Sequence, residues 1–167
     1  MNDMPRDLHV SESLTREQWL ERAHVFRSKL IERCAQVERW ATKAANSILP
    51  PATGKSRPAM VLLGHKIEEV RDLARKHPDR FGNAVKVIER LNQFQPYAEL
   101  RSELAHATTE VVILENGEAQ LQFNNAGLCH QLIERRIVLT GEAARQIAKD
   151  LADLTNQIQQ LSTKPSS

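Results

Sequence analysis

Apolar residues recur at alternating spacings of four and three through the first third of the chain. Such spacing places them along one side of an α-helix, so the sequence predicts a long amphipathic helix that ends at Pro50-Pro51. Thr15 and Gln18 stand three positions apart at its start, as in a capping box. So wide an apolar face needs several packing partners, which favours a helical bundle. The predicted core positions are Trp19, Ala23, Phe26, Leu30, Cys34, Val37, Ala41, Ala44 and Ile48.

The same periodicity predicts three further helices. One spans about residues 59–76, and the next spans about 79–94 with Asp79 as its cap. The last begins after Thr140, whose hydroxyl suits a helix N-terminus. Their predicted core positions are Met60, Leu63, Ile67, Val70 and Ala74, then Phe81, Val85, Ile88 and Leu91, and finally Ala144, Ile147, Leu151, Leu154, Ile158 and Leu161.

Two residues disturb these helical patterns. Gly64 lies inside the second helix, where glycine costs about 1 kcal/mol relative to alanine, so we expect close packing against the first helix there. Pro96 is expected to break or kink the chain after the third helix. The residues that follow it would form a short fourth element or a continuation after a bend, with Tyr97, Leu100 and Leu104 facing inward.

A β-branched stretch then interrupts the helical character of the chain. Two apolar runs flank Asn116-Gly117, which is a strong hairpin signal, so the sequence predicts a β-hairpin at about 109–123. Residues 134–139 are expected to add a third short strand. The fold class is therefore mainly α, a bundle of four to five helices with a small inserted β-hairpin. The expected parts of the chain are a flexible segment (1–14), one helical domain (15–161) and a disordered tail (162–167).

Composition says more about the size and expected location of the protein than about its function. The 167 residues suffice for one domain with its own core. No apolar run approaches the roughly 20 residues of a membrane span, and no secretory signal is expected. Cys34 and Cys129 make no disulfide framework, which favours the cytoplasm. A net charge of +2 permits a phosphate-bearing partner, whereas 4% aromatic residues leave little material for stacking bases.

Most other chemical motifs are absent or incomplete. No His-x3-His or Cys-x2-Cys pair occurs, and Cys129-His130 are adjacent, so we expect no metal site and no cofactor. Gly54-Lys55-Ser56 lacks the earlier glycine of a phosphate-binding loop, and no Gly-x-Ser-x-Gly elbow is present. The charged residues expected to be solvated, or to flank a strand, are Glu68-Glu69, Asp150, Asp153 and Arg135-Arg136.

Arg101 and His106 are the two side chains best suited to chemistry. Histidine can transfer a proton at neutral pH, and the arginine fork suits phosphoryl oxygens that gain charge during RNA cleavage. On an ideal helix their spacing corresponds to about 140° and roughly 7.5 Å, so one chain does not aim both at one point. Two chains related by a two-fold axis could do so. Spacing alone favours an ordinary exposed arginine and half-buried histidine, because such pairs are frequent.

The segment Glu99-Leu100-Arg101-Ser102-Glu103-Leu104-Ala105-His106-Ala107 resembles the R-x4–6-H motif of the HEPN superfamily. Members are all-helical domains and often metal-independent endoribonucleases. Arg101, Ala105 and His106 match the motif. Ser102 stands where members usually have Asn, Asp or His, and Ala107 stands where many have Gly. The helical order and the inserted hairpin are also similar to members of this superfamily.

The resemblance implies a homodimer whose composite site cleaves RNA. Arg101 and His106 would be its catalytic residues, and Ser102 would support them by contacting a phosphate oxygen or His106. A toxin or antiviral defence effector, with a cognate antitoxin of the nucleotidyltransferase type, is the implied setting. Two alternatives stay open, a catalytically silent HEPN-like module that binds RNA or a protein, and a helical regulator without a nucleic-acid role.

Overall fold

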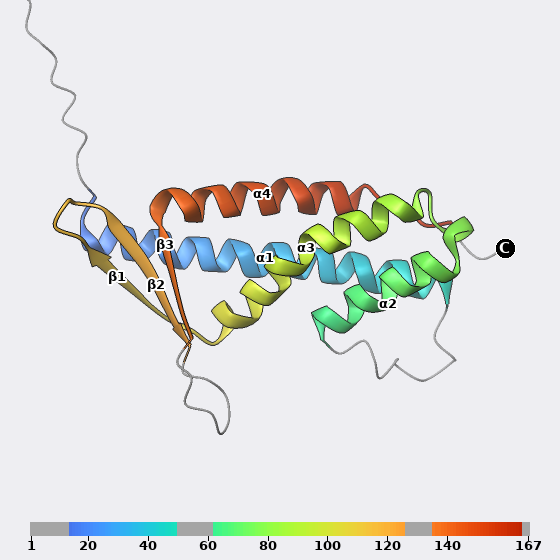
Figure 1. Ribbon diagram of the computed structural model, residues 1–167, viewed down its shortest axis with the longest axis horizontal. Helices are drawn as coiled ribbons and strands as arrows, with labels where there is room; N and C mark the ends of the chain where they lie inside the picture. The colour runs from blue at the N-terminus through green and yellow to red at the C-terminus, as the bar shows by residue number, and fades with distance from the viewer. Residues whose placement is uncertain (1–13, 50–61, 126–134, 165–167) are drawn as a thin grey trace, which may run out of the picture.

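The computed structural model describes residues 14–49, 62–125 and 135–164. They form an elongated body with one helix along most of its length and a sheet at one end (Figure 1). Four α-helices and a three-stranded antiparallel sheet confirm the mainly helical prediction. The elements are α1 (Arg16–Ile48), α2 (Leu63–Lys76), a 3-10 helix (Pro78–Arg80), α3 (Ala84–Ala105), β1 (Thr108–Ile113), β2 (Ala119–Asn125), β3 (Arg135–Thr140) and α4 (Gly141–Gln159).

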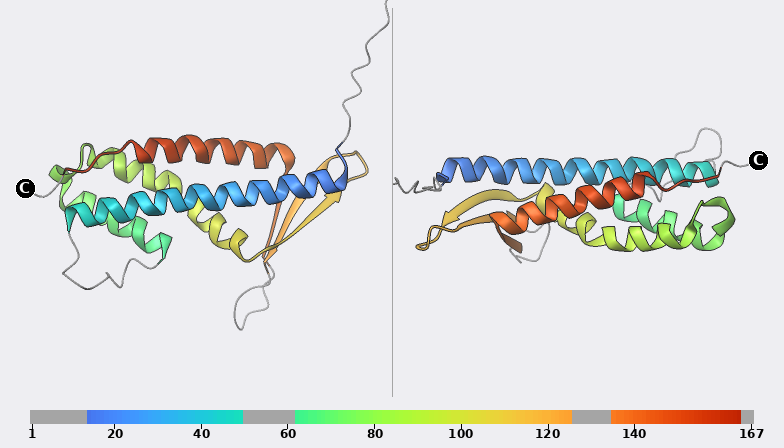
Figure 2. Two further views of the ribbon diagram at one scale, coloured as in Figure 1. Left: turned by 180° about the vertical axis from the view of Figure 1, so that it is seen from behind. Right: turned by 90° about the horizontal axis from the view of Figure 1, so that it is seen from above.

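Helix α1 is the element on which the others pack. The Gln18 N–H donates to the Thr15 hydroxyl at 3.2 Å, and the Thr15 N–H donates to the Gln18 side chain at 2.8 Å, which confirms the capping box. The helix contacts α2, α3, α4, β1 and β2. Seen from above, it lies along one side of the molecule while the sheet and α3 lie on the other (Figure 2). All its predicted core positions are buried except Trp19, which is half-buried.

The predicted hairpin is confirmed as β1 and β2. Its loop is a turn in which the Gly117 N–H donates to the Leu114 oxygen at 2.9 Å, followed by Gly117 itself at φ 82°. A left-handed residue at that point is what glycine supplies without steric cost. The third strand is also present, as β3, one residue later at each end than expected. It pairs with β2, so β2 lies in the middle of the sheet.

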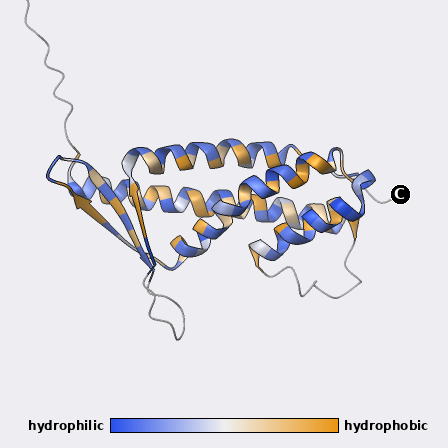
Figure 3. Ribbon diagram, in the orientation of Figure 1, coloured by the Kyte–Doolittle hydropathy of each residue, from blue (hydrophilic) through white to orange (hydrophobic). Residues whose placement is uncertain are grey.

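One face of the sheet packs against α1. Ala119, Leu121 and Phe123 alternate along β2 and are all buried. The ring centroid of Phe123 lies 5.9 Å from that of Phe26 on α1. Apolar residues of the helices likewise gather where elements face one another (Figure 3). The sheet is therefore part of the core rather than an appended loop.

Helix α3 departs most from the prediction. Asn83, not Asp79, caps it, with its side chain accepting from the Lys86 N–H at 2.9 Å. The helix then continues through Pro96 to Ala105, so no separate fourth element forms. Pro96 and Asn92 are both exposed. The carbonyl that loses its helical donor at a proline lies one turn earlier, so here it belongs to an exposed residue that water can reach.

The later start of α3 also changes which residues face inward. Val85, expected in the core, is 77% exposed, and Val87 is buried instead. Phe81 is buried but precedes the helix, and Ile88 is only half-buried. The correct apolar side of α3 consists of Val87, Leu91, Phe94, Ala98 and Leu104.

Helix α2 confirms its buried positions but not the reason given for its glycine. Leu63, Ile67, Val70 and Ala74 are buried. Gly64 is exposed, and a Cβ added there would meet no atom within 4 Å, so the expected close packing against α1 is wrong. Residues 59–61, where the helix was predicted to begin, lie outside the described residues.

Helix α4 and the residues that directly follow it end the described part of the chain. Thr140 caps α4 as predicted, accepting from the Ala143 N–H at 3.1 Å. Beyond the predicted domain end at Leu161, the Gly82 N–H donates to the Ser162 oxygen at 3.0 Å, and the Lys164 N–H donates to the Arg80 oxygen at 2.7 Å. Residues 1–13 and 165–167 lie outside the described residues. Among the helices of the described ranges, none combines the length and apolar character needed to cross a membrane.

Candidate functional site

The last turns of α3 carry the Arg–His segment to the edge of the sheet (Figure 1). Arg101 is half-buried there and Ser102 is exposed. His106 follows the last helical residue with φ −111° and ψ 0°, the sparsely populated region in which many active-site residues lie. Its side chain is exposed, so the half-buried histidine of the ordinary interpretation is not observed.

Arg101 borders α1, on the inner side of α3. The positive charge of Arg101 acts electrostatically on Cys34 of α1. Cys34 is fully buried, and its thiol donates to the Tyr97 oxygen at 3.7 Å. The pKa of Cys34 is raised to about 12, chiefly by burial, with a smaller lowering by the Arg101 charge and a smaller rise from Glu38. The thiol is therefore protonated at neutral pH, which fits the predicted structural role and not that of a nucleophile.

The three predicted site residues do not contact one another within one chain. The side chains of Arg101, Ser102 and His106 make no hydrogen bond or ion pair with any residue that the structure describes. Ser102 therefore does not hold His106 in place. A half-buried charge without a partner is uncommon, since desolvated charges are normally paired. Among the described residues, therefore, no group occupies the Arg101 guanidinium, and an anion could bind there.

Arg27 of α1 fixes the chain on both sides of His106. Its two terminal nitrogens donate to the carbonyl oxygens of Ala107 at 2.9 Å and Ala105 at 3.0 Å. The last carbonyls of a helix lack helical donors and carry partial negative charge, so a guanidinium suits them. Sequence reasoning missed this residue because nothing local to Arg27 indicates a partner about 80 residues away.

Glu103 joins the same end of α3 to the sheet. Its carboxylate accepts from Arg135 of β3 at 2.5 Å and from the Asn125 side chain of β2 at 3.0 Å. The hydrogen bond from Arg135, supported by the one from Asn125, lowers the pKa of Glu103 below its ordinary value. Together with Arg27, this contact gives the segment between Arg101 and His106 a fixed position.

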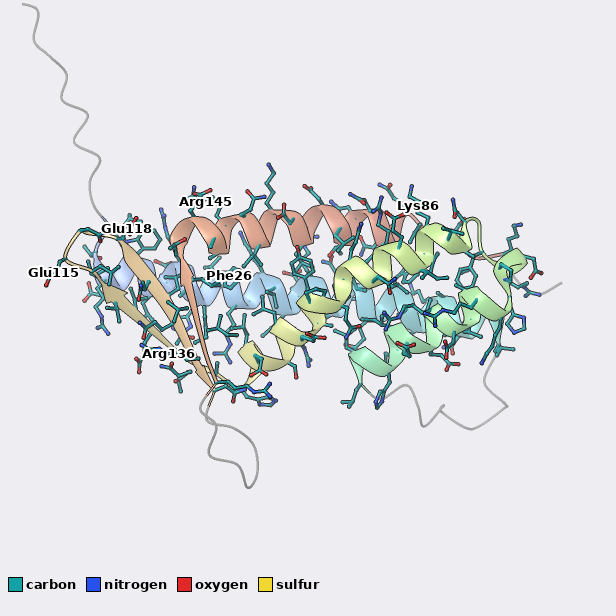
Figure 4. The ribbon with its side chains drawn as sticks, viewed as in Figure 1. Phe26, Lys86, Glu115, Glu118, Arg136 and Arg145 are labelled. Carbon is teal, nitrogen blue, oxygen red and sulfur yellow. The ribbon has the colours of Figure 1, made fainter. Side chains whose placement is uncertain are left out.

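The remaining charged motifs have ordinary roles where the structure describes them. Arg136 lies within β3 rather than beside a strand, and its side chain donates to Gln122 of β2 (Figure 4). Glu68 is exposed and pairs with Arg71 and Arg75. Within residues 14–49, 62–125 and 135–164, no three His, Cys, Asp or Glu side chains cluster as metal ligands would. The segments Gly54-Lys55-Ser56 and Cys129-His130 lie outside the described residues.

Comparison with known proteins gives no family assignment. No protein-family model matches the chain, and neither the curated proteins nor the solved structures contain a significant match. Function is therefore inferred from the residues of this chain and their geometry.

Proposed function

We propose that this protein is a metal-independent endoribonuclease of the HEPN type that acts as a homodimer. One observation carries the proposal. A half-buried arginine with no described carboxylate partner and an exposed histidine occupy the end of one helix, held by Arg27 and Glu103. These two side chains, Arg101 and His106, are the ones that match the R-x4–6-H motif.

The chemistry requires a proton transfer and charge stabilisation at phosphorus. The ribose 2′-oxygen attacks the neighbouring phosphorus, the bond from phosphorus to the 5′-oxygen breaks, and a 2′,3′-cyclic phosphate and a 5′-hydroxyl result. His106 takes the proton of the 2′-hydroxyl or gives one to the leaving 5′-oxygen, a role that histidine fills most often in general acid–base catalysis. Arg101 donates to the non-bridging oxygens, whose charge grows in the transition state.

Two chains are needed to bring these groups to one phosphate. Within a chain Arg101 lies toward α1 whereas His106 lies at the open end of the helix. A two-fold axis beside this end of α3 would set the arginine of one chain against the histidine of its partner. The implied biological setting, a toxin or defence effector countered by a nucleotidyltransferase-type antitoxin, is part of the same proposal.

The experiment is RNA cleavage by purified protein in EDTA. Wild type should cleave and leave 2′,3′-cyclic phosphate ends, whereas 2′-O-methyl RNA should resist because its nucleophile is blocked. His106→Ala should lose about 10²–10⁴-fold in rate and Arg101→Ala about 10²–10³-fold. Neither variant should melt much earlier than wild type, because neither side chain bonds to a described residue.

Three results would contradict the proposal. Equal cleavage by all three proteins would remove both residues from catalysis. Cleavage that disappears in EDTA would replace the mechanism with a metal-dependent one. Wild-type protein that binds RNA without cutting it would favour the catalytically silent module, in which Ser102 has replaced the supporting polar residue of active members.

A further inference from the structure

A basic groove lies between α1 and α4, on the side of α1 away from the residues that contact the end of α3. It consists of two adjoining hollows of about 440 and 360 Å³, which share Lys29 and Ala148. Each lies in the size range of ordinary ligand pockets. Alanines one turn apart on α4, Ala144, Ala148 and Ala152, line the α4 side, so no large side chain fills it. We call these two hollows the α1–α4 groove.

Positive charge is concentrated along this groove. Its lining contains five cations, Arg22, Lys29, Arg33, Arg145 and Lys149, and a single carboxylate, Glu32. The whole chain, by contrast, is nearly balanced, with 23 Lys and Arg against 21 Asp and Glu. A cleft lined by one sign of charge attracts a ligand of the opposite sign more strongly than scattered surface charges do.

Several of these cations have no acidic partner among the residues that the structure describes. Lys29 and Lys149 make no hydrogen bond or ion pair with a described residue. Arg33 donates to the neutral Gln36 side chain at 3.1 Å. Arg145, on the outward side of α4 in Figure 4, pairs with the exposed Glu142. Glu17 and Glu21 line a neighbouring hollow on α1, together with Lys29 and Glu32, so the groove has an acidic border on that side.

An aromatic ring lies at one end of the groove. Trp19 is half-buried, and the Arg22 guanidinium lies over its ring, 5.2 Å from the centroid. Its indole packs so closely against the first residue of α4 that a Cβ on Gly141 would lie 2.4 Å from a ring carbon. A row of cations ending at an aromatic face is the combination that single-strand binding proteins use for phosphates and bases.

We propose that the α1–α4 groove binds a single strand of RNA, with its phosphates on the cations and a base against Trp19. A single strand is favoured over a duplex because only an unpaired base can stack on the Trp19 ring. The choice of RNA rests on the proposed function. The groove is nevertheless separate from Arg101 and His106, so binding and cleavage can fail independently.

The test measures binding of a fluorescent oligouridine to the His106→Ala protein over a range of salt concentrations. Lys29→Gln and Lys149→Gln are combined in one variant, and Lys76→Gln with Lys86→Gln form the matched control, since these lysines are also exposed and unpaired among described residues. The groove variant should lose about 1.4 from the slope of log K against log salt, because each single-strand phosphate contact contributes about 0.7. At low salt it should bind roughly tenfold or more weakly, while the control keeps the full slope.

A second readout follows Trp19 directly. In a Trp40→Phe background Trp19 is the only tryptophan of the chain, and oligouridine should quench its fluorescence. Equal loss of slope in both lysine variants, or no quenching, would overturn the proposal. Polyglutamate that competes as well as RNA would also overturn it, in favour of an acidic protein partner. Because the His106→Ala protein is used throughout, absence of cleavage in wild type would leave these results unaffected.

Discussion

Single side chains from distant parts of the sequence fix the position of the proposed catalytic groups. Arg27 donates to the carbonyls before and after His106. Hydrogen bonds that involve a charged group contribute about 1.5–3 kcal/mol each, and loss of the donor leaves two carbonyls without it. Arg27 is therefore a positioning residue, which acts on His106 through the backbone.

Replacing Arg27 separates positioning from chemistry. Arg27→Gln should lower the cleavage rate at saturating RNA by about tenfold or more, with little change in KM, because misplacement affects the transition state most. Arg27→Lys should recover only part of the rate, since one ammonium cannot match the planar fork. Steady-state kinetics of the two variants measure this. A loss of stability with an unchanged rate constant in Arg27→Gln would assign it a purely structural role.

Two helical glycines provide a matched pair for the packing of Trp19. Gly64→Ala adds a methyl group where no atom lies within 4 Å, so it should stabilise the protein by up to about 1 kcal/mol. Gly141→Ala brings a methyl group to 2.4 Å from the Trp19 ring, so it should destabilise by about 1–3 kcal/mol. Urea unfolding of both variants tests this. A Gly141→Ala protein as stable as Gly64→Ala would mean that Trp19 is not held against α4.

At the scale of elements, local sequence signals predicted most of the fold. Helix α1, the hairpin and α4 were predictable because a capping residue or an Asn-Gly turn agreed with the apolar period. Helix α3 was not, because Pro96 is a breaking signal that the chain accommodates on its exposed side. The proposed site residues all lie on one short segment, so the sequence alone was enough to propose them. The contacts of Arg27 and Glu103 could not, since they join segments 78 and 32 positions apart.

The junction between α3 and β3 should make stability depend on pH. The pKa of Glu103 is lowered in the folded protein, chiefly by Arg135, so its stabilising effect is fully present above the unfolded value near 4.5. That effect is lost as the pH falls through the lower folded value. The difference in unfolding free energy between wild type and Glu103→Gln should therefore shrink from about pH 6 to about pH 3.

The same difference should be smaller when Arg135 is also changed to Gln. Glu103 would then keep only the Asn125 hydrogen bond and its own desolvation, so its pKa would lie nearer the ordinary value. Chemical unfolding of the four proteins over this pH range gives the comparison. A pH-independent difference between wild type and Glu103→Gln would show that the ion pair does not form in solution.

For the whole molecule, the proposed function depends on a dimer that would bring two copies of this segment together. Within one chain, Arg101 lies toward α1 and His106 lies at the end of α3. Neither side chain is bound by a described residue. The proposed composite site requires a dimer in which this end of α3 lies near the two-fold axis. Light scattering at tens of micromolar should show that dimer, and the α1–α4 groove of each chain should remain open in it.

Subunit mixing tests the shared site most directly. Arg101→Ala and His106→Ala proteins are assayed on RNA in EDTA, each alone and after mixing under conditions that exchange chains. Each alone should be nearly inactive. The mixture should recover about a quarter of wild-type activity, because half of the dimers are mixed and each of these rebuilds one of two composite sites. A mixture as inactive as its components, beside active wild type, would contradict the shared site, and full activity of either variant alone would contradict the catalytic role of that residue.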